Sequence, residues 1–201
     1  MRKSTRSQSI QTWLTRPIIP VLPQIVAEED LRAGASLIFL QGCELADLAG
    51  TLDWLKSGTR RDVPVAVHID LLSGLASDEA GLRYLAGLKK INGIITVRPH
   101  LVASARRLGL VAILLVFLQD SRAVERGLHI TEQARPDAIE LVPGVAALEM
   151  AREFDQVAVP RIAGGLVRTA ELARRLIEAG YNAVSTSNAA LWQLNQGALN
   201  R

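Results

Sequence analysis

The sequence predicts an α/β fold in which eight parallel strands close into a single TIM-barrel-like (β/α)8 domain. Two observations carry this prediction. Short apolar segments typical of buried strands alternate with segments of helical periodicity, and eight such units follow one another with short connections. A chain of 201 residues is long enough for one well-buried core, so the predicted barrel is compact.

Each predicted strand is a short run rich in aliphatic residues. The eight runs cover residues 18–21, 36–40, 65–71, 93–97, 111–117, 138–142, 161–164 and 183–186. Leucines at helical spacing, such as Leu45, Leu48 and Leu52, indicate helices in the segments between them. Asp120 and Thr169 stand where helices are expected to begin, and both residue types cap helix N-termini well.

The amino-terminal residues differ from the rest of the chain in their charge. Residues 1–16 contain cations and no acid: Arg2, Lys3, Arg6 and Arg16. No apolar stretch of the secretory type accompanies them, so we interpret residues 1–16 as a basic, flexible tail. Residues 17–201 then form the single barrel domain. Such a tail could also contact nucleic-acid phosphates.

Composition narrows the location and the chemistry. Hydrophobic residues make up 49% of the chain, but the longest apolar run, residues 110–118, is too short to cross a bilayer. The single cysteine, Cys43, excludes an internal disulfide and fits a reducing cytoplasm. No metal-ligand spacing of His, Cys or acidic residues occurs. We therefore expect a cytoplasmic protein with no membrane partner, no metal and no cofactor.

Two segments near the carboxyl end of the chain carry the strongest functional signal. Residues 162–165 read Ile-Ala-Gly-Gly, and residues 183–188 read Ala-Val-Ser-Thr-Ser-Asn. Glycines let backbone N–H groups approach an anion closely, and a following helix N-terminus adds unpaired donors. In a (β/α)8 barrel these are the loops after strands seven and eight, where phosphate groups commonly bind. The residues expected to bind a ligand phosphate are Gly164, Gly165, Ser185, Thr186 and Ser187.

Several predicted strands carry polar residues on one face only. In a barrel wrapped by helices, the aliphatic face packs outward and the polar face lies in the lumen. The polar set expected near the carboxyl-terminal mouth is His68, Asp70, Thr96, Arg98, Glu140 and Ser185. Asp70 and Glu140 would accept hydrogen bonds from ligand hydroxyls, or act as an acid or base, and Arg98 would hold a phosphate. The alternatives are an internal salt bridge with Arg98 and, for His68, a buried core histidine.

Basic pairs recur along the predicted helices. They are Arg60-Arg61, Lys89-Lys90, Arg106-Arg107 and Arg174-Arg175. Cations near helix C-termini complement the helix dipole, and this is the simplest interpretation of the pairs. A nucleic-acid surface is the alternative, and it requires several pairs on one face.

Many short strings of the chain occur together between residues 17 and 192. They are Pro17-Ile18-Ile19-Pro20, Val67-His68-Ile69-Asp70-Leu71 with Gly74, Asp78 and Gly81, Gly93-Ile94-Ile95-Thr96-Val97-Arg98, Arg135-Pro136-Asp137-Ala138-Ile139-Glu140-Leu141 with Pro143-Gly144, Ala163-Gly164-Gly165, and Ser185-Thr186-Ser187-Asn188 followed by Leu191-Trp192. In this combination the chain resembles the glycerol-3-phosphate-responsive antiterminators, which control bacterial glycerol-utilisation operons. Only the basic tail falls outside the resemblance.

The resemblance implies a non-enzymatic regulator that senses glycerol 3-phosphate and acts on leader mRNA, so that transcription passes a terminator. It implies that the glycine pair and the Ser-Thr-Ser segment hold the phosphate. Asp70, Glu140 and His68 would contact the glycerol hydroxyls, with Arg98 nearby. RNA contact is expected at Lys89, Lys90, Arg106 and Arg107, together with the basic tail.

One segment departs from the family pattern. The fifth strand of the family usually carries a polar pair before its Phe, whereas this chain has Leu114-Leu115 before Val116-Phe117.

The alternative function is a phosphate-ester-handling enzyme on the same barrel, an isomerase or a prenyl-glycerol-phosphate synthase, with Asp70 or Glu140 as general base. The chain shows no dedicated nucleophile, so no catalytic residue is assigned. A purely structural barrel and a homo-oligomer are left open.

Overall fold

The computed structural model describes residues 10–23, 31 and 34–196. Within them, eight parallel strands form a closed barrel in chain order, with β1 hydrogen-bonded to β8. The predicted (β/α)8 fold is therefore confirmed. The strands are β1 (Ile18–Leu22), β2 (Ile38–Leu40), β3 (Val65–His68), β4 (Gly93–Thr96), β5 (Val111–Phe117), β6 (Ala138–Val142), β7 (Arg161–Ala163) and β8 (Ala183–Thr186).

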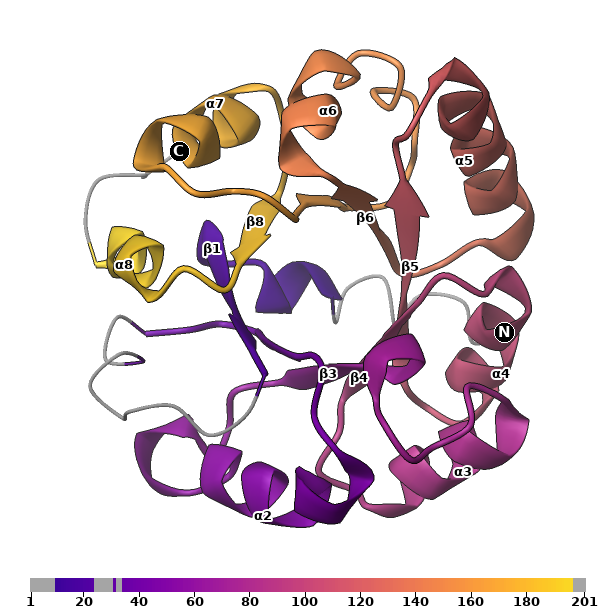
Figure 1. Ribbon diagram of the computed structural model, residues 1–201, viewed down its shortest axis with the longest axis vertical. Coiled ribbons are helices and arrows are strands. Elements are labelled where there is room, and N and C mark those ends of the chain that lie inside the picture. Colours follow the sequence, from indigo (N-terminus) through magenta and orange to yellow (C-terminus); the bar gives the residue numbers. More distant parts are fainter. Residues whose placement is uncertain (1–9, 24–30, 32–33, 197–201) are drawn as a thin grey trace.

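Helices surround this ring on its outside (Figure 1). They are α2 (Leu45–Leu55), α3 (Glu79–Gly87), α4 (Pro99–Arg107), α5 (Ser121–Ala134), α6 (Gly144–Glu149), α7 (Ala170–Glu178) and α8 (Ala189–Trp192), with short 3-10 turns η2 (Gly58–Arg60), η3 (Ile69–Leu71) and η4 (Gln193–Asn195). Asp120 and Thr169 cap α5 and α7 as predicted, because their side chains accept hydrogen bonds from Ala123 N–H and Leu172 N–H. None of the helices in the described ranges is both long and apolar enough to cross a membrane.

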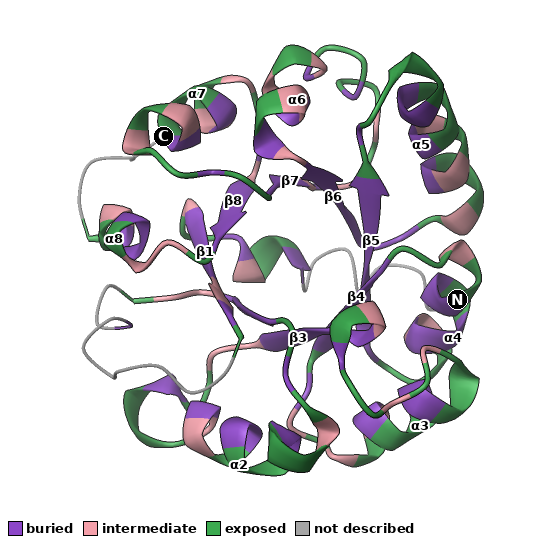
Figure 2. Cartoon of the chain, in the orientation of Figure 1, coloured by how far each residue is buried: buried purple, intermediate pink, exposed green. Residues whose placement is uncertain are grey.

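Two apolar layers hold the barrel together, and Figure 2 shows the buried strands inside a ring of half-exposed helices. The outer layer lies between strands and helices and includes Val67, Ile94 and Leu114. The inner layer fills the lumen and includes Phe39 and Ile95. Successive residues of a strand therefore alternate between the two layers, as a helix-wrapped barrel requires.

The alternation corrects two sequence predictions. The strand predicted at 65–71 ends at His68, and the chain continues as the 3-10 turn η3, so Asp70 does not lie on a strand. On β4, Ile95 occupies the lumen, so Thr96 has the outward register of Ile94, and its hydroxyl accepts a hydrogen bond from the backbone N–H of Arg98. The expected placement of Thr96 in the lumen is wrong because Ile95 holds the lumen position, and successive strand residues point to opposite faces.

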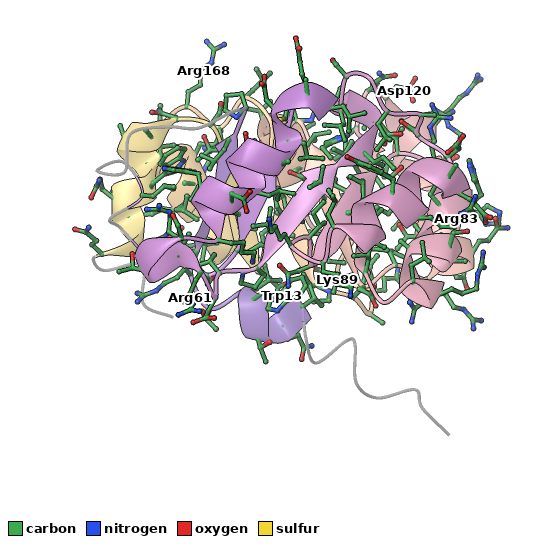
Figure 3. The ribbon with its side chains drawn as sticks, turned by 90° about the horizontal axis from the view of Figure 1, so that it is seen from below. Trp13, Arg61, Arg83, Lys89, Asp120 and Arg168 are labelled. Carbon is green, nitrogen blue, oxygen red and sulfur yellow. The ribbon has the colours of Figure 1, made fainter. Side chains whose placement is uncertain are left out.

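The expectation of a free tail over residues 1–16 is wrong for residues 10–16, and residues 1–9 lie outside the described residues. Residues 10–13 are helical, and Ile10 and Leu14 are buried against the lumen layer. Arg16 is tied to the body, because its side chain donates to the carbonyl of Asn195. In Figure 1 this indigo helical turn lies across the ring, and Figure 3 places Trp13 at the barrel end opposite Arg168. The barrel therefore has an amino-terminal end covered by the chain itself and an open carboxyl-terminal mouth.

Candidate functional site

A cavity of about 840 Å³ opens at the carboxyl-terminal mouth of the barrel. Most of the residues predicted to bind a ligand line it: His68, Glu140, Gly165, Ser185, Thr186 and Ser187. They come from the end of β3, the middle of β6, the end of β8 with the residue after it, and the loop after β7. Active and binding sites of such barrels lie at this end, because the loops that follow the strands converge there.

The loop after β7 has an unusual backbone. Gly165 and Leu166 have φ values of +68° and +57°, which lie in the left-handed region that is uncommon for a leucine. Neighbouring loops hold this conformation. The carbonyl of Gly165 accepts from the N–H of Gly144 at 2.8 Å, and the hydroxyl of Thr186 donates to the carbonyl of Val167 at 2.9 Å. Strained backbone that is fixed by its surroundings is typical of ligand-binding loops.

The loop after β8 is built around Thr186 and Asn188. The Thr186 hydroxyl accepts from the N–H of Asn188, and the Asn188 amide donates to the carbonyl of Arg168, so the two loops are joined. Thr186 thus shapes the site through its hydroxyl. Within the described part of the chain, no hydrogen bond engages the backbone N–H of Gly165 or Ser187. Two unsatisfied amides at one rim are suited to an anion.

Gly164 lies below this rim and lacks a side chain for a structural reason. A Cβ at Gly164 would stand 2.1 Å from the Ser185 Oγ and 2.5 Å from the Glu140 Oε1. Gly164 itself does not line the cavity, and its N–H donates to the carbonyl of Leu141. Gly164 leaves room for the side chains of Ser185 and Glu140, and its predicted contact with a ligand phosphate stays a prediction.

The floor of the cavity holds two buried titratable groups. Glu140 is 5% exposed, and its carboxylate accepts a hydrogen bond of 2.5 Å from the Ser185 hydroxyl. Burial raises the pKa of Glu140 to about 7, and the Ser185 hydrogen bond opposes this with a smaller effect. Burial lowers the pKa of His68, against a weaker opposite effect of Asp70. The His68 Nδ1 is buried and makes no hydrogen bond to any described residue.

Asp70 and Arg98 do not join this group. They form an ion pair with 3.0 Å between Asp70 Oδ1 and Arg98 Nε, and Asp70 Oδ2 also accepts from the N–H of Val97 at 2.8 Å. Neither residue lines the cavity. The pair joins η3 to the end of β4, as the internal-salt-bridge alternative anticipated for Asp70. Glu140 takes Ser185 as its partner instead of Arg98.

Sequence reasoning missed Arg168 and the apolar part of the cavity lining. Arg168 lines the cavity from the loop after β7, and in Figure 3 it projects from the mouth. It is three residues beyond Gly165, so its position after a predicted strand was the available signal. Gln41 and Asn188 line the cavity as well, and Leu115 and Phe117 of β5 form an apolar side. No cluster of metal-binding side chains occurs among the residues described.

The four residues expected to contact RNA lie away from the mouth. Figure 3 shows Lys89 near the end that carries Trp13. Arg106 and Arg107 are the last residues of α4, and Arg106 donates to the carbonyl of Arg135, just before β6. Three of the four cations have acidic partners: Lys90 pairs with Asp53, Arg106 with Asp137, and Arg107 with Glu79. Their contact with RNA stays a prediction.

The fold and the cavity define a TIM-barrel protein with an open cavity at the carboxyl ends of its strands. A family model described as "Glycerol-3-phosphate responsive antiterminator" matches residues 18–192. The chain belongs to this family, and the resemblance inferred from the sequence is confirmed.

Two similar solved structures carry antiterminator names, and one further relative is uncharacterised. The crystal structure of a glycerol uptake operon antiterminator regulatory protein from Listeria monocytogenes is 28% identical with a TM-score of 0.78, covering 89% of this chain and 96% of that chain. A glycerol uptake operon antiterminator-related protein from Thermotoga maritima is 31% identical with a TM-score of 0.76, covering 89% of this chain and 98% of that one. The protein YgcP of Escherichia coli K12 is 34% identical over 128 residues, which are 64% of this chain and 67% of YgcP.

Proposed function

We propose that this protein senses glycerol 3-phosphate in the mouth cavity and acts on leader mRNA of glycerol-utilisation genes as a transcription antiterminator. The observation that carries the proposal is the pair of unsatisfied amides at Gly165 and Ser187, on a rim that Arg168 also lines. Such amides and a guanidinium are the donors that phosphate groups prefer. The proposed action on leader transcripts places the protein in the cytoplasm.

The rest of the ligand would lie deeper in the cavity. A three-carbon ester bound by its phosphate at the rim directs its hydroxyls toward the floor, where Glu140 accepts hydrogen bonds and His68 has an open nitrogen. A buried polar atom without a partner costs free energy, so a ligand hydroxyl that satisfies His68 Nδ1 gains affinity. Ser185 orients the Glu140 carboxylate for the same contact.

RNA would bind at the basic surface formed by Lys89, Lys90, Arg106 and Arg107. The acidic partners of Lys90 and Arg107 do not prevent this, because these ion pairs are exposed, contribute at most about 1 kcal/mol and can exchange for a phosphate. The partner of Arg106, Asp137, is buried, so Arg106 would contact RNA while keeping that pair. The ligand must bind one conformation better than the other for a signal to pass, since equal affinity shifts no equilibrium.

Calorimetric titration tests the proposal in two steps. Glycerol 3-phosphate is expected to bind with one site per chain, while glycerol, which lacks the phosphate, does not bind. A leader RNA is then titrated with and without the ester at several salt concentrations. RNA binding that depends on salt but ignores the ester contradicts the sensor role.

An acid–base enzyme is the second candidate, and one observation favours it. The pKa of Glu140 is raised to about 7, which suits a general base near neutral pH. Incubation with phosphosugars and with prenyl-acceptor glycerol phosphates, followed by product detection, separates the two roles. Turnover that is lost in Glu140→Gln would establish the enzyme.

A further inference from the structure

The walls of the mouth cavity differ in polarity. The side formed by β7, β8 and their loops presents Gly165, Arg168 and Ser187. The side formed by β5 presents Leu115 and Phe117, and β6 contributes both Val142 and Glu140. In the closed strand order β5 is three strands away from β8, and Figure 1 shows the two strands on different sides of the ring. The apolar side chains of β5 therefore lie away from the β8 rim, while Val142 and Leu166 add apolar surface close to Gly165.

The apolar wall is partly open to solvent. Leu115 is 8% exposed and Val142 is 9% exposed, so both are core residues that also border the cavity. Phe117 is the last residue of β5, two residues after Leu115, and it is 52% exposed. Phe117 and Leu115 also border a smaller groove of about 160 Å³ beside α5, so the apolar surface continues past the rim. An exposed aromatic side chain beside a binding cavity gains free energy when a ligand covers it.

The cavity is also larger than a three-carbon phosphate ester requires. Its 840 Å³ lies within the range of roughly 300–1,000 Å³ that holds drug-sized ligands. A three-carbon phosphate ester held at Gly165 and Ser187 is much smaller than such ligands, so it leaves the Leu115 and Phe117 wall uncovered.

We infer that the mouth cavity accepts a phosphate monoester that also carries an apolar group, with the phosphate at the β7–β8 rim and the apolar group against Leu115 and Phe117. The inference rests on the proposed function for the position of the phosphate and extends it to the class of ligand. The polar wall fixes orientation through directed hydrogen bonds. The apolar wall adds affinity in proportion to the apolar area that the ligand removes from water.

The deciding experiment compares glycerol 3-phosphate with 1-O-butylglycerol 3-phosphate by calorimetry on the full chain. Both carry the same phosphate and the same secondary hydroxyl, and they differ by an ether-linked butyl chain. Partial burial of that chain predicts a Kd at least ~10-fold lower for the butyl ester. Equal or weaker binding of the butyl ester, with glycerol 3-phosphate still bound, overturns the inference and leaves the proposed function standing. If neither ester binds, the proposed phosphate site fails as well.

A pair of variants locates the apolar contact. Phe117→Ser is expected to bring the two Kd values close together, and Phe117→Leu to restore most of the difference. Val145→Ser is the matched control, because Val145 is an apolar residue of α6 that is 48% exposed and does not line the cavity. The control should keep the ~10-fold difference between the esters. A ratio that Phe117→Ser leaves unchanged contradicts the assigned contact, even if the butyl ester binds more tightly.

Discussion

The carboxylate of Glu140 on β6 and the hydroxyl of Ser185 on β8 meet across β7, directly over the Cα of Gly164. The two strands are not neighbours in the sheet, because β7 lies between them. The hydrogen bond of 2.5 Å forms only because β7 is followed by a residue without a side chain. A glycine that sequence reasoning assigned to the phosphate thus also determines how the floor of the site is built.

Gly164→Ala is expected to lower the free energy of unfolding by about 1–3 kcal/mol, the usual cost of overpacking a buried site. The new methyl group would displace both Ser185 Oγ and Glu140 Oε1, so ligand affinity should fall as well. Urea unfolding measures the first effect. Gly50→Ala in α2 is the matched control, because a Cβ there meets nothing within 4 Å, and it should be neutral or stabilising by up to ~1 kcal/mol. Equal results for the two variants would contradict the steric argument.

The free energy of unfolding should decrease as the pH rises, because of Glu140. Its pKa is about 7 in the folded protein and about 4.5 when unfolded, so between these values the folded state binds more protons. The free energy of unfolding therefore decreases as the pH rises through this window, by roughly 3 kcal/mol in total. Urea unfolding at several pH values, compared with Glu140→Gln, isolates this contribution. The same pH dependence in both proteins would refute it.

Arg168→Ala should weaken binding of glycerol 3-phosphate by at least ~10-fold, because a charge-assisted hydrogen bond contributes about 1.5–3 kcal/mol. The thermal unfolding midpoint should stay nearly constant, since Arg168 is exposed. Arg174→Ala serves as the control: Arg174 pairs with Glu171 on α7 and does not line the cavity. Equal losses of affinity in both variants would indicate a nonspecific effect of net charge.

The Asp70–Arg98 pair should stabilise the rim without contacting the ligand. Arg98 is half-exposed, so a double-mutant cycle of Asp70→Asn and Arg98→Gln is expected to give a coupling energy below about 1 kcal/mol. Asp70→Ala should lower the free energy of unfolding by about 1 kcal/mol more than Asp70→Asn does, because only the alanine variant leaves the Val97 N–H without an acceptor. Calorimetry on both variants should show little change in the Kd for glycerol 3-phosphate. A 10-fold loss of affinity for glycerol 3-phosphate would instead support the contact between Asp70 and the ligand hydroxyls that was predicted from the sequence.

Ile10→Ala should cost about 2–4 kcal/mol, because Ile10 is fully buried in the lumen layer. Gln11→Ala, on the exposed side of the same helical turn, is the control and should change stability by less than ~0.5 kcal/mol. Chemical unfolding of both variants tests whether this turn is part of the barrel. Equal stability would mean that the amino-terminal turn packs only loosely.

The strands were predictable where apolar character and strand length coincide. The predicted bounds of β5, β6 and β8 are those observed, because polar or turn residues flank each run. At β3 the alternation of Ile69 and Leu71 continues past the strand, so the pattern alone gives no sign that the chain turns after His68. At the amino terminus the prediction rested on the cations of residues 1–16 and overlooked Ile10 and Leu14, which are four residues apart and bury one side of the segment.

The site was predictable in its loops and less so in its side-chain partners. Glycine and hydroxyl residues after strands seven and eight have a local signature, and Gly165, Ser185 and Ser187 do line the cavity. Which acid would pair with Arg98 depends on three-dimensional distances that spacing does not encode. For this reason the sequence did not show that Arg98 pairs with Asp70 or that Glu140 accepts a hydrogen bond from Ser185.

The amino-terminal turn that packs Ile10 and Leu14 under the lumen has a consequence for kinetics. With that end covered, a bound ester enters and leaves through the mouth. A macromolecule seated over the mouth would block the exit of the ester, whereas RNA bound near Lys89, at the opposite end, leaves the exit open and changes the dissociation rate constant only through the proposed conformational coupling. Stopped-flow release of a labelled ester at saturating RNA therefore distinguishes the two ends: nearly complete block of release indicates RNA over the mouth, and a change no larger than the coupling factor from the RNA titrations indicates the opposite end.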